Sequence, residues 1–313
     1  MNAKRALVTD YVHPQLIADL QERGYEVDYN RTITLAGVAK VIHLYHGIIV
    51  NSKIKMMPTM IDKATQLQWI GRLGSGLEII DVDYATKKGI KVMNTPEGNR
   101  NAVAEHAVGM LLNLANNLSK GDREVRKLDW RREENRGWEL KGKTVGIIGL
   151  GHTGSKLAKK LSSWELTILS YDKYKEDTAD ELPFVERVRL ADILEHADII
   201  SLHLPLTHET THMVDKSFLE KCKKGSIIVN TSRGAVVDTS ALVQALESGH
   251  LGGACLDVFE NEKPNTYSKA ESNTYKRLYA CEHVIVSPHV AGWTSESLAR
   301  IAKVMIRKLD ASI

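Results

Sequence analysis

The stretch of residues 143–172 constrains the fold of this chain more than any other. It holds Gly149, Gly151 and Gly154 in the pattern GxGxxG, directly after an apolar, β-branched run at residues 145–148. Such a run is typical of a buried parallel strand. A strand that leads into this glycine spacing predicts the first turn of a dinucleotide-binding sheet, in which the glycines allow a tight turn, close approach of a pyrophosphate and close helix packing.

The residues after the glycines support this interpretation. Leu157, Leu161 and Trp164 recur at helical spacing, and a second apolar run at residues 166–169 leads to Asp172. The start of such a helix offers N–H groups and a positive dipole to phosphates. Asp172 is expected to accept hydrogen bonds from ribose hydroxyls and to repel a 2′-phosphate, which predicts NAD rather than NADP. The alternative, an ordinary glycine-rich turn, does not account for this order of elements.

The alternation of strand-like and helix-like segments continues along all 313 residues, a length typical of about two domains. It predicts an α/β fold with two doubly wound parallel-sheet domains, Rossmann-like or flavodoxin-like, and a cleft between them. Residues 1–98 have no GxGxxG and are the candidate substrate domain, which a C-terminal helix within residues 290–313 would complete. Residues 99–289 are the candidate NAD-binding domain. The polar segment 97–100 is expected to cross between them.

Composition excludes several classes of protein. The formal net charge of +3 is too small to indicate a nucleic-acid partner, and no apolar run approaches the length of a membrane span. The N-terminus has no signal-peptide core. Cys222, Cys255 and Cys281 form no CxxC pair, which is consistent with free thiols in the cytoplasm. No set of His, Cys and Asp residues has the spacing of metal ligands, so no metal site is expected.

A long apolar helix is expected at residues 102–118. It could be a core helix. Because Trp130 and Trp138 follow it in a charged and otherwise exposed stretch, we expect it to face the other domain or another subunit, and it suggests a two-fold homodimer.

Charged side chains follow three predicted strands of the second domain. They are Arg233, the pair Glu260 and Glu262, and His289. Because ligands of open α/β sheets bind outside the carboxyl ends of the strands, these groups are expected near the dinucleotide. A histidine can take the hydroxyl proton of an alcohol, a carboxylate can orient the imidazole, and an arginine can bind a substrate carboxylate through two hydrogen bonds.

Each of these residues also has a structural alternative. His289 could be an ordinary surface histidine, Arg233 could cap a helix or pair with Asp238, and Glu260 is as plausible as Glu262 from position alone.

The chain resembles the D-isomer-specific 2-hydroxy acid dehydrogenase family over nearly its whole length. The matching stretches are GRLGSG (71–76), VMNTPEGN (92–99), AEHAVGMLL (104–112), ELKGKTVGIIGLGHTG (139–154), LHLPLT (202–207), NTSRGAVVD (230–238), LDVFENEKP (256–264) and SPHVAGWTSES (287–297). The resemblance implies that Arg233 binds substrate, that Glu262 rather than Glu260 is the catalytic carboxylate, and that His289 is the acid/base. It also implies oxidation by NAD of a D-2-hydroxy acid.

The resemblance extends to the binding residues. It implies that Asp257 meets the nicotinamide carboxamide and that Ser75 and Gly76 offer backbone N–H groups to the substrate carboxylate. The expected cofactor-binding residues are Gly149, Gly151, His152, Thr153, Gly154, Asp172, His203, Pro205, Thr231, Ser232, Asp257 and Gly292. The expected substrate-binding residues are Asn51, Ser52, Lys53, Arg72, Ser75, Gly76 and Asn99.

The sequence is compatible with more than one substrate. The first domain is similar to the 3-phosphoglycerate dehydrogenases, yet Asn51 stands where those enzymes usually carry an arginine; Lys53 or Arg72 could replace its charge. A non-phosphorylated acid such as glycerate or lactate is therefore an alternative, as is an NAD-sensing regulator of the corepressor type. The chain ends at Ile313, so the resemblance predicts a short form without the C-terminal serine-sensing domain of longer relatives.

Overall fold

The computed structural model describes residues 3–174 and 182–312. The chain divides into two compact units, one formed by Met1–Arg100 with Trp293–Ile313 and the other by Asn101–Gly292. Residues 1–2 and 313, which belong to the predicted substrate domain, lie outside the described residues. Each unit has its own sheet and its own core, and we describe each by itself.

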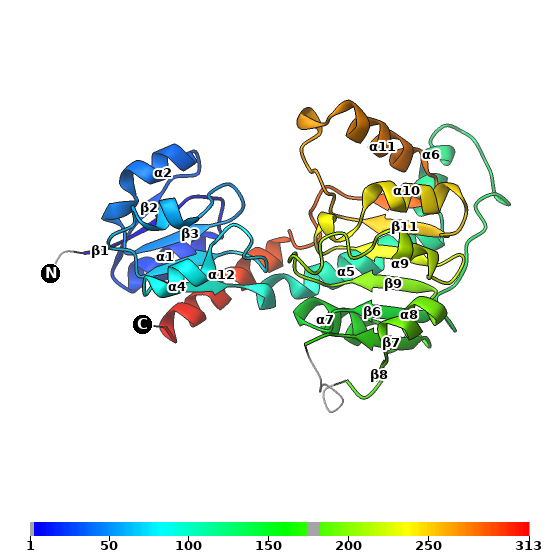
Figure 1. The fold of residues 1–313 in the computed structure, drawn as a ribbon, viewed down its shortest axis with the longest axis horizontal. Helices are drawn as coiled ribbons and strands as arrows, with labels where there is room; N and C mark the ends of the chain where they lie inside the picture. The colour runs from blue at the N-terminus through cyan, green and yellow to red at the C-terminus, as the bar shows by residue number, and fades with distance from the viewer. Residues whose placement is uncertain (1–2, 175–181, 313) are drawn as a thin grey trace. The chain divides into compact units, whose positions relative to one another are not determined.

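The first unit is built on a five-stranded parallel sheet in the order β2-β1-β3-β4-β5. Its inner strands β1, β3 and β4 are mostly buried, and one cluster of core residues lies on each face of the sheet. The C-terminal helix α12 (Ser295–Asp310) packs against α1 and buries Ile301 and Met305 in the second cluster (Figure 1). The strands are β1 (Lys4–Val8), β2 (Tyr25–Tyr29), β3 (Gly47–Val50), β4 (Trp69–Arg72) and β5 (Lys91–Asn94), and the helices α1 (Pro14–Glu22), α2 (Leu35–Val41), η1 (Ile42–Leu44), α3 (Pro58–Ile61) and α4 (Val82–Lys87).

The second unit is built on a seven-stranded parallel sheet in the order β12-β11-β10-β9-β6-β7-β8. Helices α5 and α7 cover one face, and α8, α9, α10 and α11 cover the other (Figure 1). The strands are β6 (Thr144–Ile148), β7 (Thr167–Tyr171), β8 (Val185–Arg187), β9 (Ile199–Leu202), β10 (Ile227–Asn230), β11 (Gly253–Leu256) and β12 (Val284–Val286). The helices are α5 (Pro96–Ala115), α6 (Leu118–Val125), α7 (His152–Leu161), α8 (Leu190–His196), α9 (Lys216–Glu220), η2 (Gly234–Val236), α10 (Thr239–Glu247), η3 (Pro264–Thr266) and α11 (Lys269–Ala280).

These sheets confirm the predicted α/β class with two parallel-sheet units. Residues 97–100, which were expected to cross between the domains, lie in the first turns of α5, and the boundary between the two units falls after Arg100 within this helix. Pro96 begins that helix, where the N–H that proline lacks would have no intrahelical partner. The same helix ends at Ala115 rather than at residue 118, since Asn117 takes a left-handed φ of 51° that separates α5 from α6.

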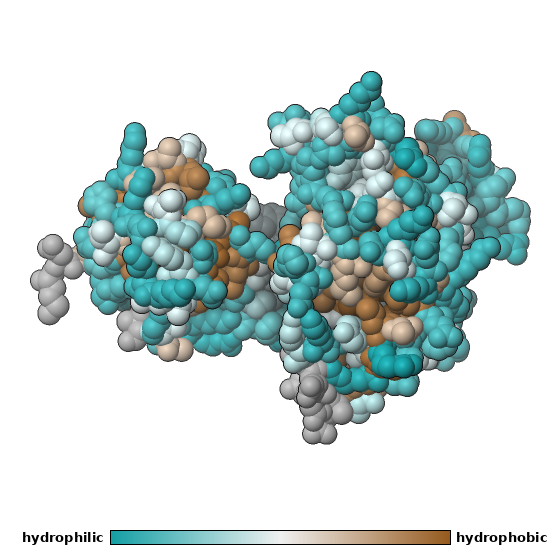
Figure 2. Space-filling model, viewed as in Figure 1, coloured by the Kyte–Doolittle hydropathy of each residue, from teal (hydrophilic) through white to brown (hydrophobic). Residues whose placement is uncertain are grey.

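The surface of each unit is mostly hydrophilic in the view of Figure 2. Within residues 3–174 and 182–312, no helix combines the length and the apolar character that crossing a membrane requires.

Candidate active site

The three predicted catalytic side chains come from neighbouring strands of the second unit. β10, β11 and β12 are adjacent and parallel, so the loops that follow them leave the same edge of the sheet. Arg233 follows β10, Glu262 follows β11 and His289 follows β12. This edge is where ligands of open α/β sheets bind.

His289 and Glu262 form a direct pair. Nδ1 of His289 lies 2.9 Å from Oε2 of Glu262, and both side chains are about half exposed. Burial by itself raises the pKa of Glu262. The hydrogen bond from His289, the backbone N–H of Phe259 and the charges of His289 and Arg233 more than compensate, so that the pKa lies below its ordinary value. The carboxylate is therefore ionised at neutral pH.

Glu260, which position alone did not distinguish from Glu262, has another role. Its Oε2 lies 2.7 Å from Nε2 of His212, and its Oε1 accepts a hydrogen bond from the backbone N–H of Thr239 at the start of α10. These contacts tie the β11 loop to α10. Glu260 is thus a structural carboxylate, and the pairing with His289 falls to Glu262.

The lowered pKa of Glu262 gives a testable dependence of stability on pH. A carboxylate whose folded pKa is lowered stabilises the fold above its unfolded pKa of about 4.3, and this contribution is lost as the pH falls through the folded pKa. We expect Glu262→Gln to destabilise the protein at neutral pH and to have a smaller effect in acid. Urea unfolding midpoints of wild type and variant across this range measure the difference. Glu195→Gln, which removes an exposed carboxylate of α8, is the control, and an equal pH trend in both variants would contradict the assignment.

The turn that carries His289 is held by Asp257. His289 has a φ of 55°, a left-handed conformation that costs a non-glycine residue roughly 1–2 kcal/mol, and its N–H donates to the Asp257 carbonyl at 2.8 Å. The Asp257 side chain, which is 1% exposed, accepts hydrogen bonds from the N–H groups of Val290 and Ala291, both at 2.9 Å, and from the Ser287 hydroxyl at 2.6 Å. This carboxylate therefore holds the turn of His289 in place, and its predicted contact with the nicotinamide stays a prediction.

The glycine turn between β6 and α7 lies at the same edge of this sheet, in which β6 is the neighbour of the central strand β9. Gly149 has a φ of +92°, and a Cβ there would lie 2.4 Å from the His203 carbonyl oxygen; a Cβ on Gly154 would lie 2.1 Å from the Gly149 carbonyl oxygen. Both glycines are thus required by the protein itself. A Cβ on Gly151 would have no atom within 4 Å. The space over Gly151, at the uncapped start of α7, is where a ligand phosphate can approach the backbone.

His203 and Thr153 support this turn from within. Burial lowers the pKa of His203 to about 4, so its imidazole is neutral. Its Nε2 lies 2.9 Å from the Ser201 hydroxyl and its Nδ1 lies 3.1 Å from the Thr153 hydroxyl. A hydroxyl at position 153, within the GxGxxG, therefore connects α7 to the end of β9.

The remaining predicted cofactor residues lie on the same edge. Asp172 follows β7, and its carboxylate accepts hydrogen bonds from the N–H groups of Leu150 at 2.8 Å and Tyr174 at 3.0 Å. Thr231 has a buried hydroxyl with no partner among the described residues. His152 begins α7, and Pro205, Ser232 and Gly292 lie in the loops after β9, β10 and β12.

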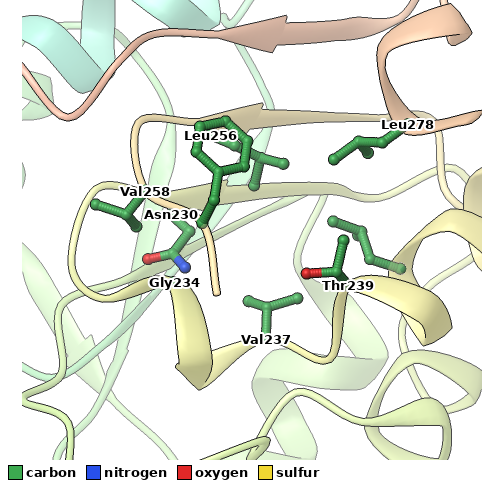
Figure 3. Close-up of a pocket in the computed structure, with 9 residues that line it drawn as sticks. Asn230, Gly234, Val237, Thr239, Leu256, Val258 and Leu278 are labelled. Atoms are coloured by element: carbon green, nitrogen blue, oxygen red, sulfur yellow. The ribbon is translucent and has the colours of Figure 1, made fainter. Parts of the chain in front are cut away.

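A small pocket lies beneath the β11 loop (Figure 3). None of the residues that line it is charged, so it is not a place for proton exchange. A Cβ on Gly234 would lie 1.9 Å from the carbonyl carbon of Phe259, so glycine at this position lets the loop of Arg233 approach the loop of Glu262. The lining residues are Asn230, Gly234, Val237, Thr239, Leu242, Leu256, Val258, Phe259 and Leu278.

The predicted substrate residues lie at the carboxyl edge of the sheet in the first unit. Ser75 is held by Asn94 and Asn99, since its carbonyl accepts from Asn94 at 2.7 Å and its hydroxyl lies 3.4 Å from Oδ1 of Asn99. Gly76 follows it in the loop after β4, and Arg72 ends that strand with its guanidinium turned onto the Leu73 carbonyl at 2.6 Å.

The segment after β3 contains Asn51, where the chain departs from the 3-phosphoglycerate dehydrogenases that it resembles. Asn51 and the exposed Ser52 precede Lys53, whose ammonium donates to the Arg31 carbonyl at 2.5 Å and lies 3.6 Å from Oδ1 of Asp10. Asp10 also accepts the N–H of Asn51 at 3.1 Å. The charge of Lys53 is therefore partly neutralised within the unit.

Two polar residues near the turn of His289, His106 and Ser287, were not singled out from the sequence. His106, on α5, places its Nε2 2.8 Å from the hydroxyl of Ser287, which in turn contacts Asp257. The two residues are 181 positions apart, so spacing carried no signal. Among the residues that the structure describes, no three His, Cys, Asp or Glu side chains are placed to share a metal ion.

Comparison with known families identifies the second unit. Residues 108–291 match the family model described as "D-isomer specific 2-hydroxyacid dehydrogenase, NAD binding domain". The chain is 33% identical to a D-3-phosphoglycerate dehydrogenase of Archaeoglobus fulgidus over 96% of this chain and 56% of the relative. It is 36% identical to one of Methanocaldococcus jannaschii, over 94% of this chain and 54% of the relative. The chain thus spans about half the length of these curated relatives.

Solved structures of similar length share the fold. A D-lactate dehydrogenase of Aquifex aeolicus, in complex with NAD and lactic acid, superposes with a TM-score of 0.85 at 30% identity, over 98% of this chain and 94% of that one. A glyoxylate reductase of Paecilomyes thermophila gives a TM-score of 0.88 at 25% identity, over 99% and 95%.

Proposed function

Because the chain belongs to the D-isomer specific 2-hydroxyacid dehydrogenase family, we propose that it is an NAD-dependent oxidoreductase that interconverts a D-2-hydroxy acid and its 2-oxo acid. The observation that carries this proposal is the pair of His289 and Glu262 on the same sheet edge as the glycine turn. The substrate domain is residues 1–98 with the C-terminal helix, and residues 99–289 bind NAD.

The residues of the glycine turn fit a dinucleotide. The open space over Gly151 and the uncapped start of α7 suit a pyrophosphate, and the carboxylate of Asp172 beside the turn suits a ribose diol. Nearby, the buried Thr231 hydroxyl, without a partner among the described residues, is available to a ligand. When bound, NAD supplies the hydride acceptor. The other proposed cofactor-binding residues are His152, Thr153, His203, Pro205, Ser232, Asp257 and Gly292.

Side chains of the protein can remove the hydroxyl proton of the substrate. Glu262 is ionised and can only accept a hydrogen bond, so Nδ1 of His289 carries a proton, and in the neutral form of the ring Nε2 has the lone pair. Nε2 is then the base that takes the hydroxyl proton of the substrate, and Glu262 stabilises the imidazolium that forms. Arg233 binds the substrate carboxylate through its guanidinium. Within the first unit, the proposed substrate-binding groups are the backbone of Ser75 and Gly76 and the side chains of Arg72 and Asn99.

A steady-state assay over a panel of D- and L-2-hydroxy acids, with NAD and NADP in parallel, tests this function. We expect NADH to form with at least one D acid, with NAD preferred over NADP. Binding of NAD without NADH formation from any acid would instead support the alternative of an NAD-sensing regulator.

The phosphorylation state of the substrate separates two candidate acids. Phosphoglycerate is suggested by the curated relatives, whereas Asn51 and the pairing of Lys53 with Asp10 favour a non-phosphorylated acid such as glycerate or lactate. Lys53→Ala, compared on 3-phosphoglycerate and on glycerate, distinguishes them. A larger loss of kcat/KM on the phosphorylated acid would support phosphoglycerate, and equal effects would remove the phosphate role of Lys53.

Two glycine substitutions are expected to separate binding from folding. Gly151→Ala fills space that no protein atom occupies, so we expect nearly unchanged stability but strongly weakened NAD binding. Gly154→Ala drives a Cβ into the Gly149 carbonyl, so we expect the protein itself to be destabilised. Calorimetric titration with NAD and thermal unfolding measure the two effects. Full NAD affinity in Gly151→Ala would contradict the proposed phosphate position.

The helix expected at residues 102–118 is a core helix rather than a subunit-facing one, since Ala107, Leu111 and Leu114 are buried in the core of the second unit. We therefore propose a homodimer formed through the segment around α6, which follows that helix. Leu118, Val125, Leu128 and Trp130 are exposed there, and Leu128 and Trp130 are 96% and 80% exposed. Sedimentation equilibrium measures the state, and a monomer at all concentrations would count against this interface. A cytoplasmic location is also proposed, with which the three free cysteines are consistent.

A further inference from the structure

A chain of hydrogen bonds leads from α5 to the turn of His289. Nε2 of His106 lies 2.8 Å from Oγ of Ser287 and 3.6 Å from Oδ1 of Asp257, and Oγ of Ser287 lies 2.6 Å from the same Oδ1. Asp257 then accepts the N–H groups of Val290 and Ala291. The last two residues directly follow His289.

The direction of these hydrogen bonds can be worked out from the chemistry of the groups. Backbone N–H groups only donate, so the Asp257 carboxylate is the acceptor in each of those contacts. The Ser287 hydroxyl has one proton, and it donates that proton to Asp257. Its oxygen must therefore accept from His106, whose Nε2 carries a proton. His106 is thus the outermost donor of the network.

Packing alone does not require a histidine at this position. The residues of α5 around it, Ala102, Val103, Ala107 and Met110, are buried and apolar, while the His106 side chain is 27% exposed. An apolar residue would continue that apolar helix face. What a histidine adds is the hydrogen bond to Ser287, at the base of a turn in which His289 is held in a left-handed conformation.

We propose that His106 is a positioning residue for proton exchange at His289, acting through Ser287 and Asp257. It fixes the turn of residues 287–291 so that Nδ1 of His289 stays on Glu262 and Nε2 is presented in one orientation. This inference rests on the proposed role of His289 as the acid/base.

The proposed role of His106 is tested by measuring which kinetic constant changes when this residue is replaced. We expect His106→Leu to lower kcat about tenfold, equivalent to about 1.4 kcal/mol, with KM and the affinity for NAD close to wild type. His106→Gln places a donating amide near the position of Nε2, and we expect it to restore most of kcat. His196→Leu, which removes an exposed histidine of α8, is the matched control. Failure of Gln to rescue, or an equal fall in NAD affinity, would overturn the proposal.

A double-mutant cycle tests the route through Ser287. If His106 acts through that hydroxyl, His106→Leu combined with Ser287→Ala should lower kcat no more than the larger single effect. Independent, multiplying effects would overturn the proposal.

A measurement without turnover separates this inference from the proposed function. We expect the amide hydrogens of Val290 and Ala291 to exchange faster in His106→Leu than in wild type and in His106→Gln, because their acceptor is less firmly held. If the wild type oxidises no acid, the proposed function fails, but the exchange rates still show whether His106 stabilises the turn through the hydrogen-bond network. Unchanged exchange in His106→Leu would overturn the network itself.

Discussion

Replacement of His289 by alanine or asparagine is expected to lower kcat by about a thousandfold while NAD binding stays close to wild type, because general acid–base groups contribute roughly 10²–10⁴-fold. The asparagine variant matters because position 289 has a φ of 55°, which asparagine tolerates better than alanine. If only the alanine variant loses turnover, the loss comes from the turn and not from the imidazole.

Stopped-flow or steady-state kinetics and calorimetric titration with NAD measure the two quantities for each variant. His196→Ala is the control, since it removes a histidine of the same unit that is exposed on α8. Comparable losses of turnover and of NAD affinity in both His289 variants would contradict the acid/base role.

Arg233→Lys is expected to lower kcat/KM for the acid about a hundredfold, or about 2.7 kcal/mol, although the positive charge remains. The planar guanidinium can hold a carboxylate through two parallel hydrogen bonds, and an ammonium cannot reproduce that geometry. Arg233 also lowers the pKa of Glu262 through its charge, an effect that lysine should largely retain.

The fall in kcat/KM should therefore appear mainly in substrate binding and hydride transfer, with NAD affinity unchanged. Arg277→Lys is the matched control, because Arg277 forms a surface pair with Glu247 on α11 and α10. An Arg233→Lys variant with wild-type kcat/KM would remove Arg233 from the substrate site.

Patterns of apolar residues were sufficient to predict most of the fold. Apart from β8, the strands from β3 to β12 follow short runs that are mostly apolar, a character typical of strands buried in parallel sheets. The helix α2 was missed because Leu35–Val41 is short, contains Gly37 and has little helical periodicity. The edge strand β8 was missed because Val185–Arg187 has three residues, of which two are charged. Tertiary pairing with β7, and not local preference, makes it a strand.

The site was less accessible to pattern reasoning. Strand ends and family resemblance together pointed to Arg233, Glu262 and His289, but spacing alone could not separate Glu262 from Glu260, which lie two positions apart. Their partners separate them, since His289 and His212 approach from distant parts of the chain. His106 was not predicted for the same reason: its contact with Ser287 joins distant parts of the chain and forms only when α5 packs on the sheet.

Transfer of deuterium tests the central proposal most directly. A D-2-hydroxy acid that carries deuterium at C2 is incubated with the protein and NAD, and the reduced dinucleotide is analysed by mass spectrometry. We predict that the reduced dinucleotide gains one deuterium with the D acid and none with the L acid, at a rate that falls about a thousandfold in His289→Asn. Absence of deuterium in the dinucleotide with every D acid tested, while NAD binds normally, would contradict the proposed function.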